Sequence, residues 1–370
     1  MLLCHRLDQG GSERQMTEVA KGLNRDAFSP HVGSFHPIGI RAVELQAAKV
    51  PILHLPVTSF ASLSTLRGGL TFLRYIKRHQ IRLVHSFDVP LNIFAVPFAT
   101  LAQSPVVLSS QRAHRQLTPG IYTQLLRLTD KLVDGIVVNC LHMRDHLIID
   151  EHVPPNLVHL CYNAIDLSVF NREQLPSALP ADFVPKGGTV IGVVCALRPE
   201  KGLITLISAF EIVHRCHPTT RLLIVGSGPM LEALKFQVET LSLRNVTMFV
   251  SRTADVAPWL RAMAIFVLPS ETEAFSNSLM EAMACGCCCV ASLVGGNPEL
   301  LGSNTRGLLF AKGNAGDLAK ALSTLLRDTS MRDSLADAGN RYIHSFDKSV
   351  SIRCMEELYS MVLEERRTKN

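Results

Sequence analysis

The stretch PSETEAFSNSLMEAMACGCCCVASLVGGNPEL, residues 269–300, sets two carboxylates, Glu273 and Glu281, eight positions apart around a predicted helix start. Ser276 and Asn277 are favourable N-caps, so we expect the helix to begin there, with Glu281 in its second turn and Glu273 in the preceding loop. A lone buried carboxylate is costly unless it has a partner. Glu281 is expected to be such a group, because its neighbours are all apolar: Leu279, Met280, Ala282, Met283 and Ala284.

Both carboxylates and the free N–H groups of the first helical turn could converge on one ligand. Carboxylates accept hydrogen bonds from sugar hydroxyls, and a helix N-terminus favours a phosphate. The pattern therefore indicates a ligand that carries both groups, such as a nucleotide sugar. The alternative is purely structural, with one Glu near a helix cap and the other in an internal salt bridge.

Short apolar runs alternate with longer segments of helical spacing from end to end, which is typical of parallel α/β sheets. The proline- and glycine-rich segment 171–188 predicts a linker between two halves. The expected fold class is α/β, with two doubly wound, Rossmann-like domains that face each other across a ligand-binding cleft. The predicted strands are residues 2–4, 31–35, 83–86, 106–109, 135–139 and 157–161 in the first half, and 190–195, 221–225, 246–250, 265–268 and 289–292 in the second.

Composition narrows the class of protein. A chain of 370 residues is long enough for two domains, and 47% hydrophobic with 19% charged residues is typical of a globular protein. The chain has no uninterrupted apolar stretch of the ~18 residues that a membrane span needs, and its first residues do not form a secretory signal. Ten cysteines without regular spacing indicate reduced, buried thiols in a cytoplasmic protein.

A cysteine cluster, CGCCC at residues 285–289, contains one CxxC spacing. A closed zinc site needs four ligands, and no second pair or nearby histidine supplies them, so we expect no metal there. The alternative is a short buried strand, CCCVAS, in which cysteine acts as a small hydrophobe.

Two glycine-rich turns follow predicted strands. Gly10 and Gly11 precede a predicted helix, where backbone can approach a phosphate or sugar closely. The turn GSGPML, residues 226–231, begins like a dinucleotide-binding fingerprint. It lacks the third glycine, because Leu231 stands at that position, and this argues against a dehydrogenase.

A basic loop, VCALRPEKGL at residues 194–203, follows the first predicted strand of the second half. It supplies Arg198 and Lys201, two cations at a strand end where an anionic leaving group could bind. The alternative is a solvated turn. The chain has no Asp-x-Asp sequence to hold a metal-chelated diphosphate, so fixed cations are expected to neutralise that charge.

In this order and spacing, Gly10-Gly11, RPEKG, GSGP, the Glu-x7-Glu stretch and GGNPEL resemble the retaining glycosyltransferases of family 4, which have the GT-B fold. The resemblance covers nearly the whole chain, including the segments VVNCLHMRDHL and YNAIDLSVF. It implies an acceptor-side domain over residues 1–170, completed by a C-terminal helix within residues 345–370. It also implies a nucleotide-sugar-binding domain over residues 189–344, after the linker 171–188.

The resemblance implies a hexosyltransferase that needs neither a metal nor another cofactor. Glu281 would bind the ribose hydroxyls of a nucleoside diphosphate sugar, and Glu273 a hydroxyl of the transferred sugar. Arg198 and Lys201 would stabilise the departing phosphate, without a protein nucleophile. Further donor contacts are expected from Gly10, Gly11, Gly226, Phe275, Ser276, Asn277 and Ser278.

Two positions leave alternatives open. His114, in SSQRAHRQ, is the candidate for the sugar-contacting histidine of the family, and the alternative is a surface histidine beside Arg112 and Arg115. Ala196 stands where the family usually has an arginine, so Arg198 would take that role. The rival functions are a nucleotide-sugar epimerase with the GT-B fold and a catalytically silent nucleotide-sugar-binding relative.

The basic segment LRGGLTFLRYIKRHQIR, residues 66–82, points to the acceptor. It predicts an amphipathic helix with Leu70, Leu73 and Ile76 on its apolar face, and its cations are Arg67, Arg74, Lys77, Arg78 and Arg82. With a net charge of +5, we expect residues 67–82 to contact an anionic membrane peripherally at its cytoplasmic face, where the acceptor is a lipid-linked or cell-envelope glycan. The alternative is a surface helix that covers the next strand. Aromatic residues make up only 6% of the chain and are not interleaved with basic runs, which argues against nucleic acid.

Overall fold

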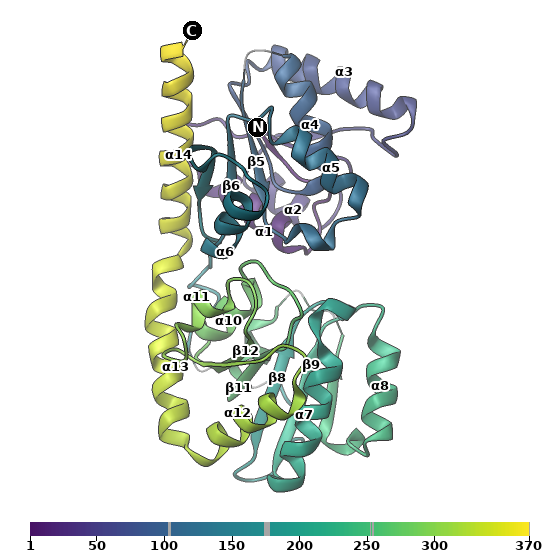
Figure 1. Ribbon diagram of the computed structural model, residues 1–370, viewed down its shortest axis with the longest axis vertical. Coiled ribbons are helices and arrows are strands. Elements are labelled where there is room, and N and C mark those ends of the chain that lie inside the picture. The colour runs from purple at the N-terminus through teal and green to yellow at the C-terminus, as the bar shows by residue number, and fades with distance from the viewer. Residues whose placement is uncertain (103–104, 174–177, 252, 254, 370) are drawn as a thin grey trace. The chain divides into compact units, whose positions relative to one another are not determined.

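The computed structural model describes residues 1–102, 105–173, 178–251, 253 and 255–369, and the chain divides into two units (Figure 1). Unit 1 comprises residues 1–164 and 348–370, and unit 2 comprises residues 165–347. Each unit is built on its own parallel β-sheet, as the alternation of apolar runs predicts.

Unit 1 contains a seven-stranded sheet in the order β3-β2-β1-β4-β5-β6-β7, with every pair of neighbours parallel. Its inner strands β4, β5 and β6 are buried along their whole length, and each contains a short apolar run in the sequence. The strands are β1 (Leu2–Leu3), β2 (Val32–Ser34), β3 (Ile52–His54), β4 (Leu83–Ser86), β5 (Val106–Gln111), β6 (Gly135–Val138) and β7 (Val158–Leu160).

The helices of unit 1 form two groups by contact, α1 with α2 and α14, and α3 with α4 and α5. Local sequence fixes several of their starts: the side chains of Ser62 and Asp88 accept hydrogen bonds from the first turns of α3 and α4. The helices are α1 (Gly11–Gly22), α2 (Ile40–Ala47), α3 (Leu63–Arg78), α4 (Val89–Leu101), α5 (Gly120–Thr129), α6 (Leu141–Asp145) and α14 (Lys348–Lys369), with a π-helical turn (His146–Asp150) and 3₁₀ turns (Arg115–Leu117, Pro155–Leu157).

The C-terminal helix α14 belongs to the core of unit 1. Met355, Leu358, Tyr359 and Val362 are buried in the same apolar cluster as β1 and β5. The Tyr359 hydroxyl also lies 2.7 Å from Nδ1 of His85, a fully buried residue of β4. This polar contact fixes α14 on the sheet across a separation of 274 residues in the chain.

Unit 2 contains a six-stranded parallel sheet in the order β10-β9-β8-β11-β12-β13. Its strands are β8 (Thr189–Val194), β9 (Thr220–Val225), β10 (Thr247–Val250), β11 (Ile265–Leu268), β12 (Cys288–Ser292) and β13 (Leu308–Phe310). Its helices are α7 (Leu203–Cys216), α8 (Leu231–Thr240), α9 (Ala257–Arg261), α10 (Asn277–Ala284), α11 (Asn297–Leu301), α12 (Ala315–Arg327) and α13 (Thr329–Ile343), with 3₁₀ turns (Pro199–Lys201, Arg244–Val246, His344–Phe346).

Every predicted strand is present, with shifts of one or two residues at some ends, and two strands were missed. These are β3 and β13, each three residues long and each at an edge of its sheet. Their sequences are ILH and LLF, and apolar runs as short as three residues do not by themselves distinguish a strand from other structure.

The boundary between the units differs from the predicted one. Ile165 pairs with Asp347 as a parallel bridge, so the chain joins unit 2 at residue 165 instead of 171. The segment predicted as a linker packs against the rest of unit 2 in two places: the Arg261 guanidinium donates a hydrogen bond to the carbonyl oxygen of Asn171, and Arg221 Nε donates to the carbonyl of Phe183. Residues 174–177 of that segment lie outside the described residues.

The cysteines occur as free thiols. Cys288 and Cys289 begin the buried strand β12, as the alternative to a zinc site predicted, and burial raises the pKa of Cys289 well above its ordinary value. In unit 1, Cys161 Sγ lies 3.3 Å from Cys354 Sγ on α14, a thiol pair that the sequence did not reveal. No helix among the described residues is both long and apolar enough to cross a bilayer.

Candidate functional site

The candidate site of unit 2 lies at the carboxyl ends of β8 and β11, neighbouring strands in the sheet. β9 and then β10 lie on one side of β8, and the chain then crosses to β11 on the other side of β8. This reversal of strand order is the position at which doubly wound sheets bind ligands. The loop after β8 carries RPEKG and the loop after β11 carries Glu273, so the topology brings these two motifs together.

Lys201 and Glu273 form a close ion pair, with Lys201 Nζ 2.5 Å from Glu273 Oε1. The same carboxylate oxygen accepts a hydrogen bond of 2.9 Å from Ser270 Oγ. Burial alone would lower the pKa of Lys201, but the charge and the hydrogen bond of Glu273 outweigh it and raise that pKa. Lys201 is therefore a fixed positive charge at neutral pH, as a phosphate-stabilising group must be.

Backbone contacts join the two loops that carry this pair. The Glu271 N–H donates a 2.8 Å hydrogen bond to the carbonyl of Glu200. Gly202, which follows Lys201, has a φ of 63°, and a Cβ on it would lie 2.0 Å from the carbonyl oxygen of Pro269. Only glycine allows this approach, so the Lys-Gly sequence of the basic loop positions Lys201 against the loop of Glu273.

The GGNPEL motif supports the same loop from the other side. The Gly296 N–H donates a 2.7 Å hydrogen bond to the carbonyl of Ala274. Gly295 has a φ of 53°, and a Cβ on it would lie 1.9 Å from the carbonyl oxygen of Glu273. The backbone of Glu273 is thus held between the basic loop and the GGNPEL turn.

Helix α10 begins where the sequence predicts. Ser276 is its N-cap, with the side chain accepting a hydrogen bond from the Leu279 N–H, and Asn277 is its first residue. Glu281 lies in the second turn and is only 5% exposed, which confirms the prediction that this carboxylate is buried. Phe275 is buried, and Asn277 and Ser278 are partly exposed at the helix start.

The GSGP turn after β9 holds the start of the basic loop. The Leu197 N–H donates to the carbonyl of Ser227, and the Met230 N–H donates to the carbonyl of Leu197. Gly226 approaches the backbone of Cys195 so closely that a Cβ would lie 1.9 Å from its carbonyl oxygen. Gly226 therefore shapes the loop that leads to Lys201.

Arg198 is placed differently from Lys201. Its side chain is 64% exposed, and its only ion pair among the described residues is a 3.9 Å approach to Glu200. Ala196, at the position of the family arginine, is exposed as well. The structure thus brings Lys201 and Glu273 together and leaves Arg198 extended into solvent.

In unit 1, Gly10 is the N-cap of α1 and Gly11 its first residue, after β1. A Cβ on Gly10 would overlap the flexible carboxylate of Glu13. Asp88, which the sequence did not single out, lies at the carboxyl end of the neighbouring strand β4. Its carboxylate accepts hydrogen bonds from the N–H groups of His5 and Leu91, and burial raises its pKa. The sequence signal was an Asp followed two residues later by Pro90, an ordinary helix start.

His114 belongs to a histidine cluster. Its ring centroid lies 4.1 Å from that of His146 and 6.0 Å from that of His142, and its Nδ1 accepts a hydrogen bond from the Gln116 N–H. Burial lowers the pKa of His114, and the two other rings lower it further. His114 is therefore a partly buried, neutral group at the carboxyl end of β5.

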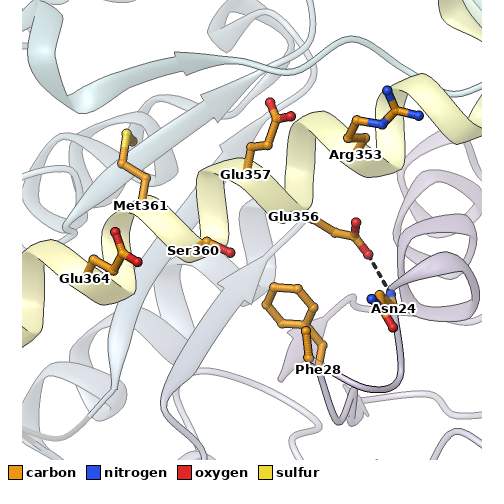
Figure 2. A pocket seen from close by; sticks show the side chains of 9 residues that line it. Asn24, Phe28, Arg353, Glu356, Glu357, Ser360, Met361 and Glu364 are labelled. Atoms are coloured by element: carbon orange, nitrogen blue, oxygen red, sulfur yellow. Dashed lines mark hydrogen bonds between the residues drawn. The ribbon is translucent and has the colours of Figure 1, made fainter.

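A hollow of about 480 Å³ in unit 1 lies between α14 and the turn after α1, away from these residues. Phe28 and the side chains of Glu356, Glu357 and Met361 line it, and Glu356 accepts a hydrogen bond from the Asn24 N–H (Figure 2). None of the predicted site residues contributes to it.

Two family models match the chain. The model described as Glycosyltransferase Family 4 matches residues 9–169, and the model described as Glycosyl transferases group 1 matches residues 178–342. The second segment contains all of the unit 2 motifs described above.

Curated proteins and solved structures are similar to the chain as well. N-acetyl-alpha-D-glucosaminyl L-malate synthase of Bacillus anthracis is 26% identical over 204 residues, which cover 55% of this chain and about half, 53%, of that protein. UDP-Gal:alpha-D-GlcNAc-diphosphoundecaprenol alpha-1,3-galactosyltransferase of Escherichia coli is 22% identical over 309 residues, 80% of this chain and 79% of that protein. The crystal structure of Anabaena HepE in complex with UDP-glucose superposes with a TM-score of 0.82 at 20% identity, covering 97% of this chain and 98% of that chain, and shows the GT-B fold.

The Gly295→Ala variant is expected to unfold more easily than the wild type. Alanine is strained at a φ of 53°, and its Cβ would overlap the carbonyl of Glu273, so we expect a loss of more than about 1 kcal/mol of unfolding free energy. Thermal unfolding measures this. The matched control is Gly120→Ala, since that Cβ would meet nothing within 4 Å. If both variants melted like the wild type, Gly295 would not support the Glu273 loop.

Proposed function

Because the chain belongs to the glycosyltransferases of group 1 and family 4, we propose that it moves a hexosyl group from a nucleoside diphosphate sugar to an acceptor hydroxyl, with retention of configuration and without a metal. The observation that carries this proposal is the Lys201–Glu273 pair, at the switch point of the unit 2 sheet and directly before the start of α10. A cation, a carboxylate and free helical N–H groups gather there, and they match the phosphate and hydroxyls of the donor.

We assign the donor contacts accordingly. Glu281 binds the ribose hydroxyls, the N–H groups of residues 275–278 bind the diphosphate, and Glu273 binds a hydroxyl of the transferred sugar. Glu281 is 5% exposed and lies in the second turn of α10, and its carboxylate can accept hydrogen bonds from ribose hydroxyls. Gly10 and Gly11 lie at the equivalent switch point of unit 1, and we assign them to donor binding too.

In the proposed reaction, the bond between the sugar C1 and the phosphate oxygen breaks, and a bond from C1 to the acceptor oxygen forms on the same face. The departing phosphate takes the proton of the acceptor hydroxyl, so no protein base is needed. Lys201 stabilises the negative charge that develops on the phosphate. Arg198, which is exposed, would add a second charge only after its side chain reorients.

The acceptor is proposed to be a lipid-linked or cell-envelope glycan at the cytoplasmic face of a membrane. The name of the Escherichia coli relative includes a diphosphoundecaprenol acceptor, and that of a Campylobacter jejuni relative, 26% identical over 226 residues, includes a diphospho-undecaprenol. Those names describe acceptors of the relatives, and they favour the same chemical class for this chain.

Helix α3 is the proposed membrane contact, with a correction to the predicted apolar face. Ile76 is buried against unit 1, whereas Leu63, Leu66 and Leu70 are 80%, 59% and 52% exposed. These three leucines lie at helical spacing on the solvent side, where Arg67, Arg74, Lys77 and Arg78 are exposed too. An outward face of leucines among cations suits an anionic lipid surface.

The proposed function predicts stabilisation of the protein by nucleoside diphosphate sugars in the presence of EDTA. Binding raises the melting temperature with the logarithm of ligand concentration over Kd, so a thermal-shift screen of UDP-, GDP- and ADP-sugars is the measurement, with NAD as control. Stabilisation by one series, followed by acceptor-dependent consumption of that donor, is the expected result. Consumption without an acceptor would indicate an epimerase, and binding without turnover a silent relative.

The Glu281→Ala variant is expected to bind the stabilising donor more weakly by about 1.5–3 kcal/mol, the usual contribution of a hydrogen bond to a charged group. Calorimetric titration measures it. The control is Glu232→Ala, whose side chain is 82% exposed in the same unit. An unchanged Kd in folded Glu281→Ala protein would rule out the ribose role.

The protein is expected to bind anionic lipid vesicles at low salt, and the double variant Leu66→Ser, Leu70→Ser to bind them less. Cosedimentation with phosphatidylglycerol vesicles measures this. Phe236→Ser is the control, because Phe236 is 73% exposed but lies on α8 of unit 2. Equal binding of all three proteins would exclude α3 as the contact, and no binding by the wild type would exclude the membrane.

A further inference from the structure

Arg112 is a cation at the carboxyl end of the unit 1 sheet, the first residue after β5. Its guanidinium lies 4.9 Å from the centre of the Phe87 ring, and its Nη1 donates a 2.8 Å hydrogen bond to Asn163 Oδ1. Its Nε is buried and has no hydrogen-bond partner among the described residues. The side chain is thus held in place by one neutral acceptor and one aromatic face.

The surroundings of Arg112 supply no counter-charge. The groups that most favour its charged form are Cys161, Tyr359 and Cys4. The pKa of each of these three is itself raised, so none is ionised at neutral pH. Burial lowers the pKa of Arg112 to about 10, which leaves it protonated under the same conditions. Within the part of the chain that the structure describes, no carboxylate forms an ion pair with it.

Arg115, three residues further along the same loop, shows how the fold neutralises a structural arginine. Its Nη2 lies 2.5 Å from Asp130 Oδ2, and its Nη1 lies 3.1 Å from Glu151 Oε2. Two carboxylates thus form ion pairs with the buried Arg115, and no carboxylate among the described residues forms one with Arg112. Arg112 is partly exposed, but its Nε is buried, and a partly desolvated charge without a counter-ion is costly to fold, so its presence calls for a reason other than folding.

The amide of Asn139, which contacts the same asparagine as Arg112, is also incompletely paired among the described residues. Asn139, at the end of β6, donates through Nδ2 to the same Asn163 Oδ1 at 3.3 Å. Asn139 is 2% exposed, and its Oδ1 has no hydrogen-bond partner among the described residues. The asparagines therefore hold the guanidinium in one orientation at the end of the sheet without neutralising it.

We propose that Arg112 binds a phosphate ester, and that this phosphate belongs to the acceptor. The inference rests on the proposed function, in which unit 2 binds the nucleotide of the donor, Gly10 and Gly11 of unit 1 also contact the donor, and the rest of unit 1 is available to the acceptor. A guanidinium matches phosphate geometry through paired N–H donors, and the carboxyl ends of parallel strands are where such ligands bind. An acceptor phosphate supplies the anion that the chain does not provide to Arg112. The other possible source of the same chemistry is the diphosphate of the donor.

Binding of inorganic pyrophosphate in the presence of saturating UDP tests this. UDP occupies the donor site, so we expect pyrophosphate to stabilise the wild type further and to bind Arg112→Met at least tenfold more weakly. Arg112→Lys, which keeps the charge but loses the paired donors, is expected to fall between them. UDP alone is expected to bind all three proteins equally.

Thermal unfolding without ligand separates binding from a structural role. Arg112→Met removes an uncompensated charge and keeps an apolar contact with Phe87, so its melting temperature is expected to equal or exceed that of the wild type. Arg115→Met is the matched control and is expected to melt lower, because it removes the ion pair of Asp130 and leaves Glu151 with Arg127 alone.

Three results would overturn the proposal. The first is a melting temperature of Arg112→Met as low as that of Arg115→Met. The second is a loss of UDP affinity in Arg112→Met, which would assign the phosphate to the donor. The third is equal binding of pyrophosphate by the wild type and by Arg112→Met. In each case the thermal-shift screen with nucleotide sugars still decides the proposed function. Conversely, if no sugar nucleotide stabilised the protein, the pyrophosphate titration without UDP would still test Arg112.

Discussion

The contact between the loops after β8 and β11 is the constraint on which the rest of the unit 2 site depends. Lys201 and Glu273 are 72 residues apart in the chain, and their 2.5 Å ion pair requires that both loops be fixed at the switch point of the sheet. The Glu271 N–H donates across the junction to the carbonyl of Glu200, and Gly202 and Gly295 let neighbouring backbones approach where a side chain would collide. These glycines thus fix the positions of the Lys201 and Glu273 side chains, because they allow the backbones of the loops to pack closely.

The sequence was informative wherever a property is local. The inner strands, the start of α10 and the burial of Glu281 follow from runs of apolar residues and from an N-cap, which depend on neighbours in the chain. Contacts between distant segments were out of reach: the pairing of Lys201 with Glu273, and the histidine cluster around His114, require the fold. The predicted apolar face of α3 holds for Leu70, which is exposed, but is wrong for Ile76, which is buried, since a helix with apolar residues on two sides does not indicate which side packs against the domain.

In the loop after β5 of unit 1, carboxylates neutralise one arginine but, among the described residues, not the other. The chain places two carboxylates on Arg115, and it leaves Arg112 between an aromatic ring and an asparagine. Both arginines follow β5, and a desolvated charge is costly at either position, so the difference between them is informative. Asp88 has a comparable setting, because backbone N–H groups hold its carboxylate while burial raises its pKa. Functional sites commonly retain such destabilising charged groups, which selection for folding stability alone would remove.

The ion pair between Lys201 and Glu273 also bears on how a donor would be received. Glu273 is the neutralising partner of Lys201 in the free protein, and Ser270 holds the same carboxylate oxygen at 2.9 Å. A diphosphate that binds beside Lys201 supplies a second anion, so Lys201 no longer depends on Glu273 for neutralisation. Glu273 keeps its hydrogen bond from Ser270 and can then accept a sugar hydroxyl. Under the proposed function, the ion pair of the free protein therefore preserves the charge and position of Lys201 until the diphosphate replaces Glu273 as its partner. The Glu273 carboxylate then changes from a counter-ion to a sugar-binding group while it stays in the same loop.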